Sequence, residues 1–372
     1  MNLPPENVPH DGPGVAGEAE HEADLARNAL ELKALLVAAG HGVPGALRLE
    51  RIEAGISNET YVVRGVIEPR GGSIPAAGTW VFRRPPRDHV LPTAHDMERE
   101  FSTLRFLAGQ RYAAPKPLLL ASASSSLGSS YVMSWEAGRT LVSARDTALL
   151  TPAERARVSY EFIGALARLH QLDVTTYPRR SRSTTPFVAR QLSVWRRQWE
   201  AGDPPPGLTR AFDDVAARLS PWAESRSTGT AAVLVHGDYR LDNAIFDDDF
   251  HVRAVLDWEL ATVGDAWCDL GLLLVYWAEA ADDERARIGI AEGTTQHPGF
   301  PTRHELIEYY ASVGATPPDD LDHYTAVGYL KLAAIFQGIH ARLRIRPQQG
   351  ERFSTIADAI PRLLSLAGQA CG

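Results

Sequence analysis

The sequence predicts an α+β fold in two lobes, with a small antiparallel β-sheet in the N-terminal lobe and a mainly helical C-terminal lobe. At 372 residues, of which 44% are hydrophobic, the chain can bury a sizeable core and is long enough for two lobes. Short apolar runs separated by turn residues fill much of the first third of the chain. The remainder repeats its apolar residues mostly at helical spacing.

The first lobe is expected to follow a disordered leader. Residues 1–22 are rich in proline and glycine and show no periodic pattern, so we predict that they are disordered. A helix is predicted from Ala23 to Ala39, because leucines recur on one face and a glycine follows. We place the N-terminal lobe at residues 23–137 and the C-terminal lobe at residues 138–372.

Five strands are expected in the N-terminal lobe, because its short apolar runs are separated by turn residues. They are Leu47 to Ala54, Glu59 to Ile67, Thr79 to Arg84, Pro115 to Ala121 and Tyr131 to Trp135. Apolar residues at helical spacing predict a helix from Ala94 to Leu107, between the third and fourth strands.

The C-terminal lobe opens with a helix-start signature at Thr151-Pro152-Ala153-Glu154: a capping residue, a proline at the first position and a glutamate at the third. Residues 270–280 are apolar on every side, which predicts a buried helix. Further helices are expected from His304 to Ser312 and from Leu321 to Arg344.

Composition excludes several functional classes. A net charge of -8 argues against a general nucleic-acid binder. No apolar run reaches the 18 residues of a membrane helix, and no signal sequence opens the chain, so we expect a cytoplasmic protein without a membrane partner. The two cysteines, Cys268 and Cys371, form no disulfide or zinc pattern. The usual marks of zinc proteases, serine hydrolases and Walker nucleotide-binding loops are absent from the sequence.

Residues 233–269 contain the main candidates for catalytic and metal-binding residues. Two apolar strand-like runs, Ala231 to Val235 and Val252 to Leu256, each end at a polar cluster. His236, Asp238 and Asn243 have the spacing of the protein-kinase catalytic loop. There, an aspartate takes the proton of the substrate hydroxyl and an asparagine five residues later holds magnesium.

Asp257 follows the second strand, in the place of the metal-binding aspartate of kinases. Hard oxygen ligands suit Mg²⁺, and a carboxylate aimed at the acceptor orients the hydroxyl without a covalent intermediate. The competing interpretation of these residues is a set of turns and helix caps in a strand-loop-strand unit.

At these residues the stretch resembles the aminoglycoside phosphotransferase family of kinase-like enzymes, which have His-Gly-Asp where protein kinases have His-Arg-Asp. Val-His-Gly-Asp-Tyr-Arg-Leu-Asp-Asn followed by Val-Leu-Asp-Trp-Glu-Leu-Ala is similar to the branch related to the kinase domain of acyl-CoA dehydrogenase family members 10 and 11. The resemblance implies a two-lobed protein-kinase-like fold that binds ATP or GTP with Mg²⁺ in a cleft between the lobes. It gives Asp238 and His236 to catalysis, and Asn243 and Asp257 to the metal.

The same resemblance assigns the nucleotide site. Arg83 takes the place of the usual ATP-contacting lysine, a departure from the general kinase pattern, and Glu100 is chosen over Glu98 as its ion-pair partner. A solvated strand-end arginine and a plain surface carboxylate are the competing interpretations. Arginine keeps the positive charge of lysine and can bind phosphate through two hydrogen bonds.

Two backbone segments are expected to bind the nucleotide. Ser57 and Asn58 lie in the turn where the family places its phosphate loop, although an ordinary hairpin turn would give the same sequence. By resemblance, Met133 lines the adenine site and the main chains of Ser134 and Glu136 bind the base.

The favoured reaction moves the γ-phosphate to a hydroxyl of a small molecule, by resemblance a hydroxyacyl-CoA or a hydroxy acid. An arginine-rich segment, residues 173–200, is either a solvated helix face or a site for the phosphates of a CoA thioester. The alternatives are phosphorylation of an aminoglycoside or macrolide antibiotic, a catalytically silent nucleotide-binding module, and magnesium-dependent phosphoester hydrolysis.

Overall fold

The computed structural model describes residues 15–52, 58–68, 70, 77–85, 96–178, 183–226, 232–282, 285, 288, 293–345 and 354–372 of the chain. The chain divides into two compact units. The first comprises Met1–Phe101 and Lys116–Trp135, and the second comprises Ser102–Pro115 and Glu136–Gly372.

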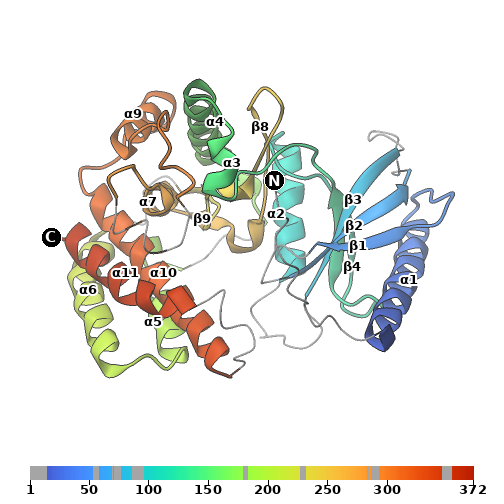
Figure 1. Cartoon of the computed structure of the whole chain (residues 1–372), viewed down its shortest axis with the longest axis horizontal. Helices are drawn as coiled ribbons and strands as arrows, with labels where there is room; N and C mark the ends of the chain where they lie inside the picture. Colours follow the sequence, from blue (N-terminus) through green and yellow to red (C-terminus); the bar gives the residue numbers. More distant parts are fainter. Residues whose placement is uncertain are drawn as a thin grey trace, which may run out of the picture. The chain divides into compact units, whose positions relative to one another are not determined.

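The first unit is built on a five-stranded antiparallel sheet with the strand order β1-β2-β3-β5-β4 (Figure 1). Its strands are β1 (Arg48–Ile52), β2 (Glu59–Val66), β3 (Ala77–Arg84), β4 (Pro117–Ala121) and β5 (Ser130–Ser134). All five strands predicted from the sequence are present. The register sets Arg83 of β3 opposite Thr60 of β2 and Tyr131 of β5.

Helix α1 (Val15–Ala38) packs against this sheet. Its buried residues Leu32 and Leu36 join Val63, Trp80 and Val132 in one hydrophobic cluster. Burial of this apolar surface is what holds a helix of this length on the sheet.

The start of α1 corrects the predicted leader of residues 1–22. The helix already begins at Val15. Proline and glycine crowd the sequence up to Gly14, whereas alanine and glutamate, both good helix formers, dominate from Val15 onward. The earlier residues of the leader lie outside the described part of the chain.

Helix α2 (Met97–Gly109) begins in the first unit and continues into the second. The second unit then holds two small antiparallel sheets, β6 (Val233–Val235) with β9 (Thr262–Gly264) and β7 (Ala244–Phe246) with β8 (Val252–Val255).

Helices form most of the second unit (Figure 1). They are α3 (Ala144–Ala148), α4 (Pro152–His170), α5 (Phe187–Ala201), α6 (Pro206–Ser225), α7 (Ala266–Tyr276), α9 (Arg303–Val313), α10 (Leu321–Ile345) and α11 (Ser354–Ala370). Helix α10 packs against α5, α7 and α11. The protein therefore has the predicted α+β class, with the sheet in one unit and the helices mainly in the other.

Two local predictions are confirmed in the second unit. The side chain of Thr151 accepts from the backbone N–H of Glu154, whose carboxylate in turn accepts from the N–H of Thr151. Helix α7 is buried as expected, although it ends at Tyr276 rather than Ala280. Within the described ranges, no helix combines the length and the apolar character that crossing a membrane requires.

Candidate active site

Strand β6 leads directly into the turn His236-Gly237-Asp238. Gly237 has φ +85°, a left-handed conformation that favours glycine. A Cβ atom at this position would lie 2.8 Å from Cβ of Leu260. The glycine thus permits both the sharp turn and the close approach of the neighbouring backbone.

His236 is fully buried beneath this turn. Its Nδ1 accepts from the backbone N–H of Asp238 at 3.2 Å, so the ring proton lies on Nε2, which is 2.8 Å from the carbonyl oxygen of Leu256. The ring also contacts Trp258, with centroids 4.6 Å apart. Both ring nitrogens of His236 are used within the loop, so the predicted part of His236 in catalysis would act through the position of Asp238.

Asp269, near the start of α7, supports the turn through hydrogen bonds to its backbone. It is 1% exposed, and its carboxylate accepts from the backbone N–H groups of His236 at 2.6 Å and Gly237 at 2.8 Å. Nε2 of His170 lies 3.3 Å from the same carboxylate. Burial raises the pKa of Asp269, but the hydrogen bonds that its carboxylate accepts, from His170 and from the backbone of His236, outweigh burial and lower the pKa. The carboxylate therefore stays ionised and holds the loop.

Asn243 and Asp257 lie close to the turn because two hairpin strands bring them to one end. The register pairs Ala244 with Val255, so the residue before β7 and the residues after β8 are neighbours. The side-chain N–H of Asn243 donates to the main-chain oxygen of Asp238 at 3.0 Å. The backbone N–H of Leu256 donates to the main-chain oxygen of Asn243 at 2.7 Å.

Asp257 adopts a left-handed backbone conformation with φ +63°. This conformation is unfavourable for a residue with a side chain, and such residues cluster at functional sites. The structure therefore brings the predicted residues Asp238, Asn243 and Asp257 together, with Asp257 in a conformation that the surrounding fold must maintain.

The donor atoms of this cluster fit magnesium. Because the amide nitrogen of Asn243 is used by Asp238, its amide oxygen is the atom left for a cation, beside the carboxylate of Asp257. Mg²⁺ is commonly held by one or two protein oxygens together with substrate phosphates and water. In the described ranges, no group of three or more His, Cys, Asp or Glu side chains is suited to a metal ion. A cation at Asn243 and Asp257 would therefore need further ligands from its substrate.

In the first unit, Arg83 forms the expected ion pair with Glu100. The atoms NH1 and Oε1 are 2.5 Å apart, and the two side chains are only 12% and 2% exposed. Tyr131 lies beside the pair, and its burial raises its pKa well above the ordinary value, so it remains a neutral hydroxyl. A solvated arginine and a surface carboxylate, the competing interpretations, do not match this burial.

The remaining nucleotide-site residues are placed as follows. Asn58 is buried just before β2, whereas Ser57 lies outside the described residues. Met133 is buried in β5. The backbone N–H of Ser134 donates to the main-chain oxygen of Lys116 at 2.9 Å, so an adenine contact at Ser134 would use its carbonyl. In the second unit, the carboxylate of Glu136 is 3.5 Å from Nε of Arg253.

Two residues that sequence analysis missed contact the catalytic turn. The hydroxyl of Tyr276 donates to Oδ1 of Asp238 at 2.9 Å. The ammonium group of Lys331 in α10 donates to the main-chain oxygen of Gly237 and lies over the ring of Trp195, 5.1 Å from its centroid. Burial lowers the pKa of Lys331, while the charge of Asp238 acts against that shift. The rarity of lysine in this arginine-rich chain was a signal for Lys331.

Most residues of this site also lie within a match to a known protein family. Residues 48–306 match the model of the phosphotransferase enzyme family. The chain belongs to this phosphotransferase enzyme family. The matched range includes β1, the Arg83–Glu100 pair and the whole catalytic turn.

Two relatives that are similar to this chain are longer proteins. Acyl-CoA dehydrogenase family member 11 of Gallus gallus is 31% identical over 86% of this chain and 40% of its own length. Acyl-CoA dehydrogenase family member 10 of Mus musculus is 30% identical over 86% of this chain and 28% of its own length. The chain thus spans less than half the length of these relatives.

Solved structures share the fold. A candidate aminoglycoside phosphotransferase of Ralstonia eutropha aligns with a TM-score of 0.69 and 25% identity, over 92% of this chain and 98% of that protein. An aminoglycoside phosphotransferase solved with ADP and hygromycin B aligns with a TM-score of 0.55 and 16% identity, over 91% and 98% of the two chains. The kinase-like fold and the resemblance predicted from the central motif are therefore confirmed.

Proposed function

We propose that this protein transfers the γ-phosphate of ATP or GTP to a hydroxyl of a small molecule, with a hydroxyacyl-CoA or a hydroxy acid as the favoured acceptor. The observation that carries the proposal is the proximity of Asp238, Asn243 and Asp257 at one end of the β7–β8 hairpin. Phosphoryl transfer depends mainly on positioning of the reactants and on neutralisation of the phosphate charge. Asp238 would position the acceptor hydroxyl, and Asn243 and Asp257 would hold the cation that neutralises the charge.

Each residue of the turn has a distinct proposed role. Asp238 orients the acceptor hydroxyl and takes its proton. Asn243 and Asp257 hold Mg²⁺, which when bound would neutralise negative charge on the phosphates. His236 fixes the backbone from which Asp238 projects, because its ring bonds to that backbone on one side and to Leu256 on the other.

In the first unit, Arg83 is proposed to steady the nucleotide phosphates and Glu100 to orient Arg83. The short, buried contact between them supports this assignment, since the carboxylate fixes the direction of the guanidinium, a group that suits phosphate. The turn at Ser57 and Asn58 would donate backbone N–H groups to the phosphates, and the segment from Met133 to Glu136 would hold the base.

The choice of acceptor rests on the relatives and on charge. The similar relatives carry names of the acyl-CoA dehydrogenase family, which favours an acyl-CoA over an antibiotic. Of the arginine-rich segment, Arg196 is already paired with Glu200 at 3.1 Å and Asp213 at 3.2 Å, whereas Arg197 on the same helix is exposed. The segment therefore offers less free positive charge for CoA phosphates than its sequence suggests. An antibiotic hydroxyl stays the alternative, because one neighbour was solved with hygromycin B.

The acceptor can be identified with labelled nucleotide. The protein is incubated with γ-labelled ATP or GTP, Mg²⁺ and one acceptor at a time: a hydroxyacyl-CoA, the free hydroxy acid, hygromycin B or a macrolide. Label in the acyl-CoA or hydroxy acid supports the favoured function. Label only in an antibiotic replaces it with the alternative. Nucleotide binding without transfer to any acceptor indicates a silent module, and phosphate release from a phosphoester without nucleotide indicates a hydrolase.

Replacement of Asp238 tests the role assignment. Asp238→Ala should lower kcat by about 10²- to 10⁴-fold, because the acceptor hydroxyl loses its base, and should leave nucleotide affinity nearly unchanged. Asp248→Ala is the matched control, since Asp248 is a fully exposed carboxylate paired with Arg139 at 3.3 Å. Wild-type turnover in the Asp238 variant would contradict the assignment.

A further inference from the structure

Tyr276 is the last residue of α7, and its hydroxyl donates to Oδ1 of Asp238 at 2.9 Å. The side chain is 7% exposed. Burial, reinforced by the negative charge of Asp238, raises the pKa of Tyr276 well above its ordinary value. The hydroxyl therefore remains a protonated donor over the pH range in which the reaction would run.

We propose that Tyr276 is a positioning residue that fixes the carboxylate of Asp238 for phosphoryl transfer. This inference rests on the proposed function. A carboxylate can rotate about its last bond, and rotation would move both oxygens away from an acceptor. The hydrogen bond to Oδ1 restrains that rotation and leaves Oδ2 for the acceptor hydroxyl.

Arg240 holds the ring of Tyr276 in place. Its guanidinium lies over the ring, 5.2 Å from the centroid. The guanidinium is itself fixed by Asp242, through a 2.7 Å bond from Nε to Oδ1 and a second bond from NH2 to Oδ2. A planar, two-point ion pair against an aromatic face is a rigid arrangement.

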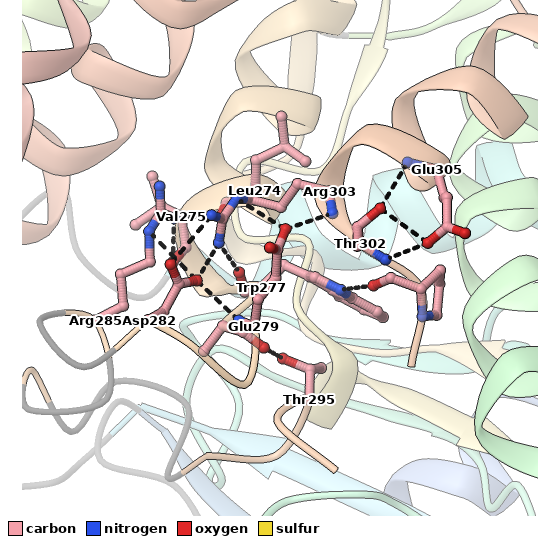
Figure 2. Close-up of polar contacts among 12 residues, drawn as sticks. Leu274, Val275, Trp277, Glu279, Asp282, Arg285, Thr295, Thr302, Arg303 and Glu305 are labelled. Atoms are coloured by element: carbon pink, nitrogen blue, oxygen red, sulfur yellow. Dashed lines mark hydrogen bonds and ion pairs between the residues drawn. The ribbon is translucent and has the colours of Figure 1, made fainter. Parts of the chain in front are cut away.

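Two half-buried arginines fix the chain at the end of α7, as Figure 2 shows. NH1 of Arg285 donates to the carbonyl oxygen of Leu274 at 2.7 Å, and NH1 of Arg303 donates to that of Trp277 at 2.9 Å. Both arginines pair with Asp282. These bonds satisfy carbonyls that the end of a helix leaves without an internal partner.

The residues after Tyr276 are tied down as well (Figure 2). Nε1 of Trp277 donates to the carbonyl oxygen of Pro301 at 2.8 Å, and the hydroxyl of Thr295 donates to that of Ala278 at 2.8 Å. The main chain is therefore restrained on both sides of Tyr276.

The ring has little room to move. The cavity beside it, lined by Phe162, Leu273 and Trp277 among others, has a volume of about 30 Å³. Such a space accepts about one water molecule and is too small for a phenol ring. Tyr276 is thus held against Asp238 by its bond, its stacking partner and its surroundings.

A competing possibility has the opposite consequence. The hydroxyl of Tyr276 could occupy the place that an acceptor hydroxyl needs, in which case it would block the reaction. Removal of the hydroxyl distinguishes the two roles. Turnover falls if the hydroxyl positions Asp238, and it rises if the hydroxyl blocks the acceptor.

The test is Tyr276→Phe, which keeps the ring and its contact with Arg240. We expect kcat with the accepted substrate to fall about 10- to 100-fold, as for small losses of alignment, with the KM for nucleotide unchanged. Arg240→Lys should give a smaller fall of the same kind, since lysine keeps the charge and loses the two-point bond.

Tyr324→Phe is the matched control. Tyr324 is also buried, and its hydroxyl donates to the carboxylate of Asp265 at 2.8 Å, away from the catalytic turn. It should lower the Tm without lowering kcat. If Tyr276→Phe only lowered the Tm in the same way, or if it raised turnover, the inference would be overturned. A wild-type protein that transfers no phosphate would overturn the proposed function and this inference with it.

Discussion

Asp238 and Asp269 both belong to the catalytic turn region, but their surroundings differ. Asp269 is 1% exposed and receives two backbone N–H groups, at 2.6 Å and 2.8 Å, with His170 close by. Asp238 is partly exposed and receives the hydroxyl of Tyr276 on one oxygen. One carboxylate is enclosed by donors, and the other keeps an oxygen for a substrate.

This difference distinguishes two kinds of residue around the turn. Holding residues bond to its backbone and fix its shape, and acting residues would contact the substrate or the metal. His236, Asp269 and the ammonium group of Lys331 all bond to the backbone of the turn, so their contribution is to its shape. Asp238, Asn243 and Asp257 present oxygen atoms at its surface. Replacement of a holding residue should cost stability, whereas replacement of an acting residue should cost turnover alone.

The largest effect on stability is expected for Asp269→Asn. The amide keeps the shape of the side chain but loses the charge, and its NH2 group would face backbone N–H donors. We expect the free energy of unfolding to fall by about 3 kcal/mol, as for the loss of one partner in a buried charged network. Urea unfolding measures it, with Asp248→Asn as the exposed control. A loss no larger than that of the control would remove the distinction between the two carboxylates.

Gly237→Ala should have the next largest effect. The added Cβ would meet Cβ of Leu260 at 2.8 Å, at a φ of +85° that alanine disfavours. We expect a loss of about 2 kcal/mol. Gly207→Ala in α6 is the control, because no atom lies within 4 Å of a Cβ there, and alanine should slightly stabilise the helix. Equal melting temperatures for the two variants would show that the turn tolerates a side chain.

The smallest effect is the pH dependence that Asp269 confers. Its pKa is lower in the folded protein than in the unfolded chain. The unfolded state therefore binds the proton first as the pH falls, so this contribution is complete above about pH 4 and is lost as the pH falls through the folded pKa. Urea unfolding of the wild type and Asp269→Asn across pH 3 to 7 measures it. The difference between the two proteins should shrink below about pH 4, and a constant difference would contradict the assignment.

Local signals made much of the fold predictable. The strands of the first unit follow from apolar runs broken by turn residues, and the start of α4 follows from the capping pattern at Thr151. Asp265 precedes α7 as its N-cap and accepts from the N–H of Trp267 at 3.2 Å, as aspartate commonly does at the start of a helix. Each of these signals depends on residues close together in the chain.

The supporting contacts could not be predicted in this way. Tyr276 is 38 residues from Asp238, and Lys331 is 94 residues from Gly237. Residues 270–276 of α7 are apolar or aromatic on every side, so their periodicity does not single out Tyr276 as a residue that contacts the turn. The early start of α1 was missed because proline and glycine counts describe a region rather than a boundary.

The bond between Lys331 and the carbonyl of Gly237 sets a lower limit on the size of a working fragment. The family match ends at residue 306, before α10 begins at Leu321. A protein truncated at that residue would keep every acting residue and lose the ammonium group that supports their turn. Domain borders drawn from sequence similarity alone would therefore cut away part of the catalytic scaffold.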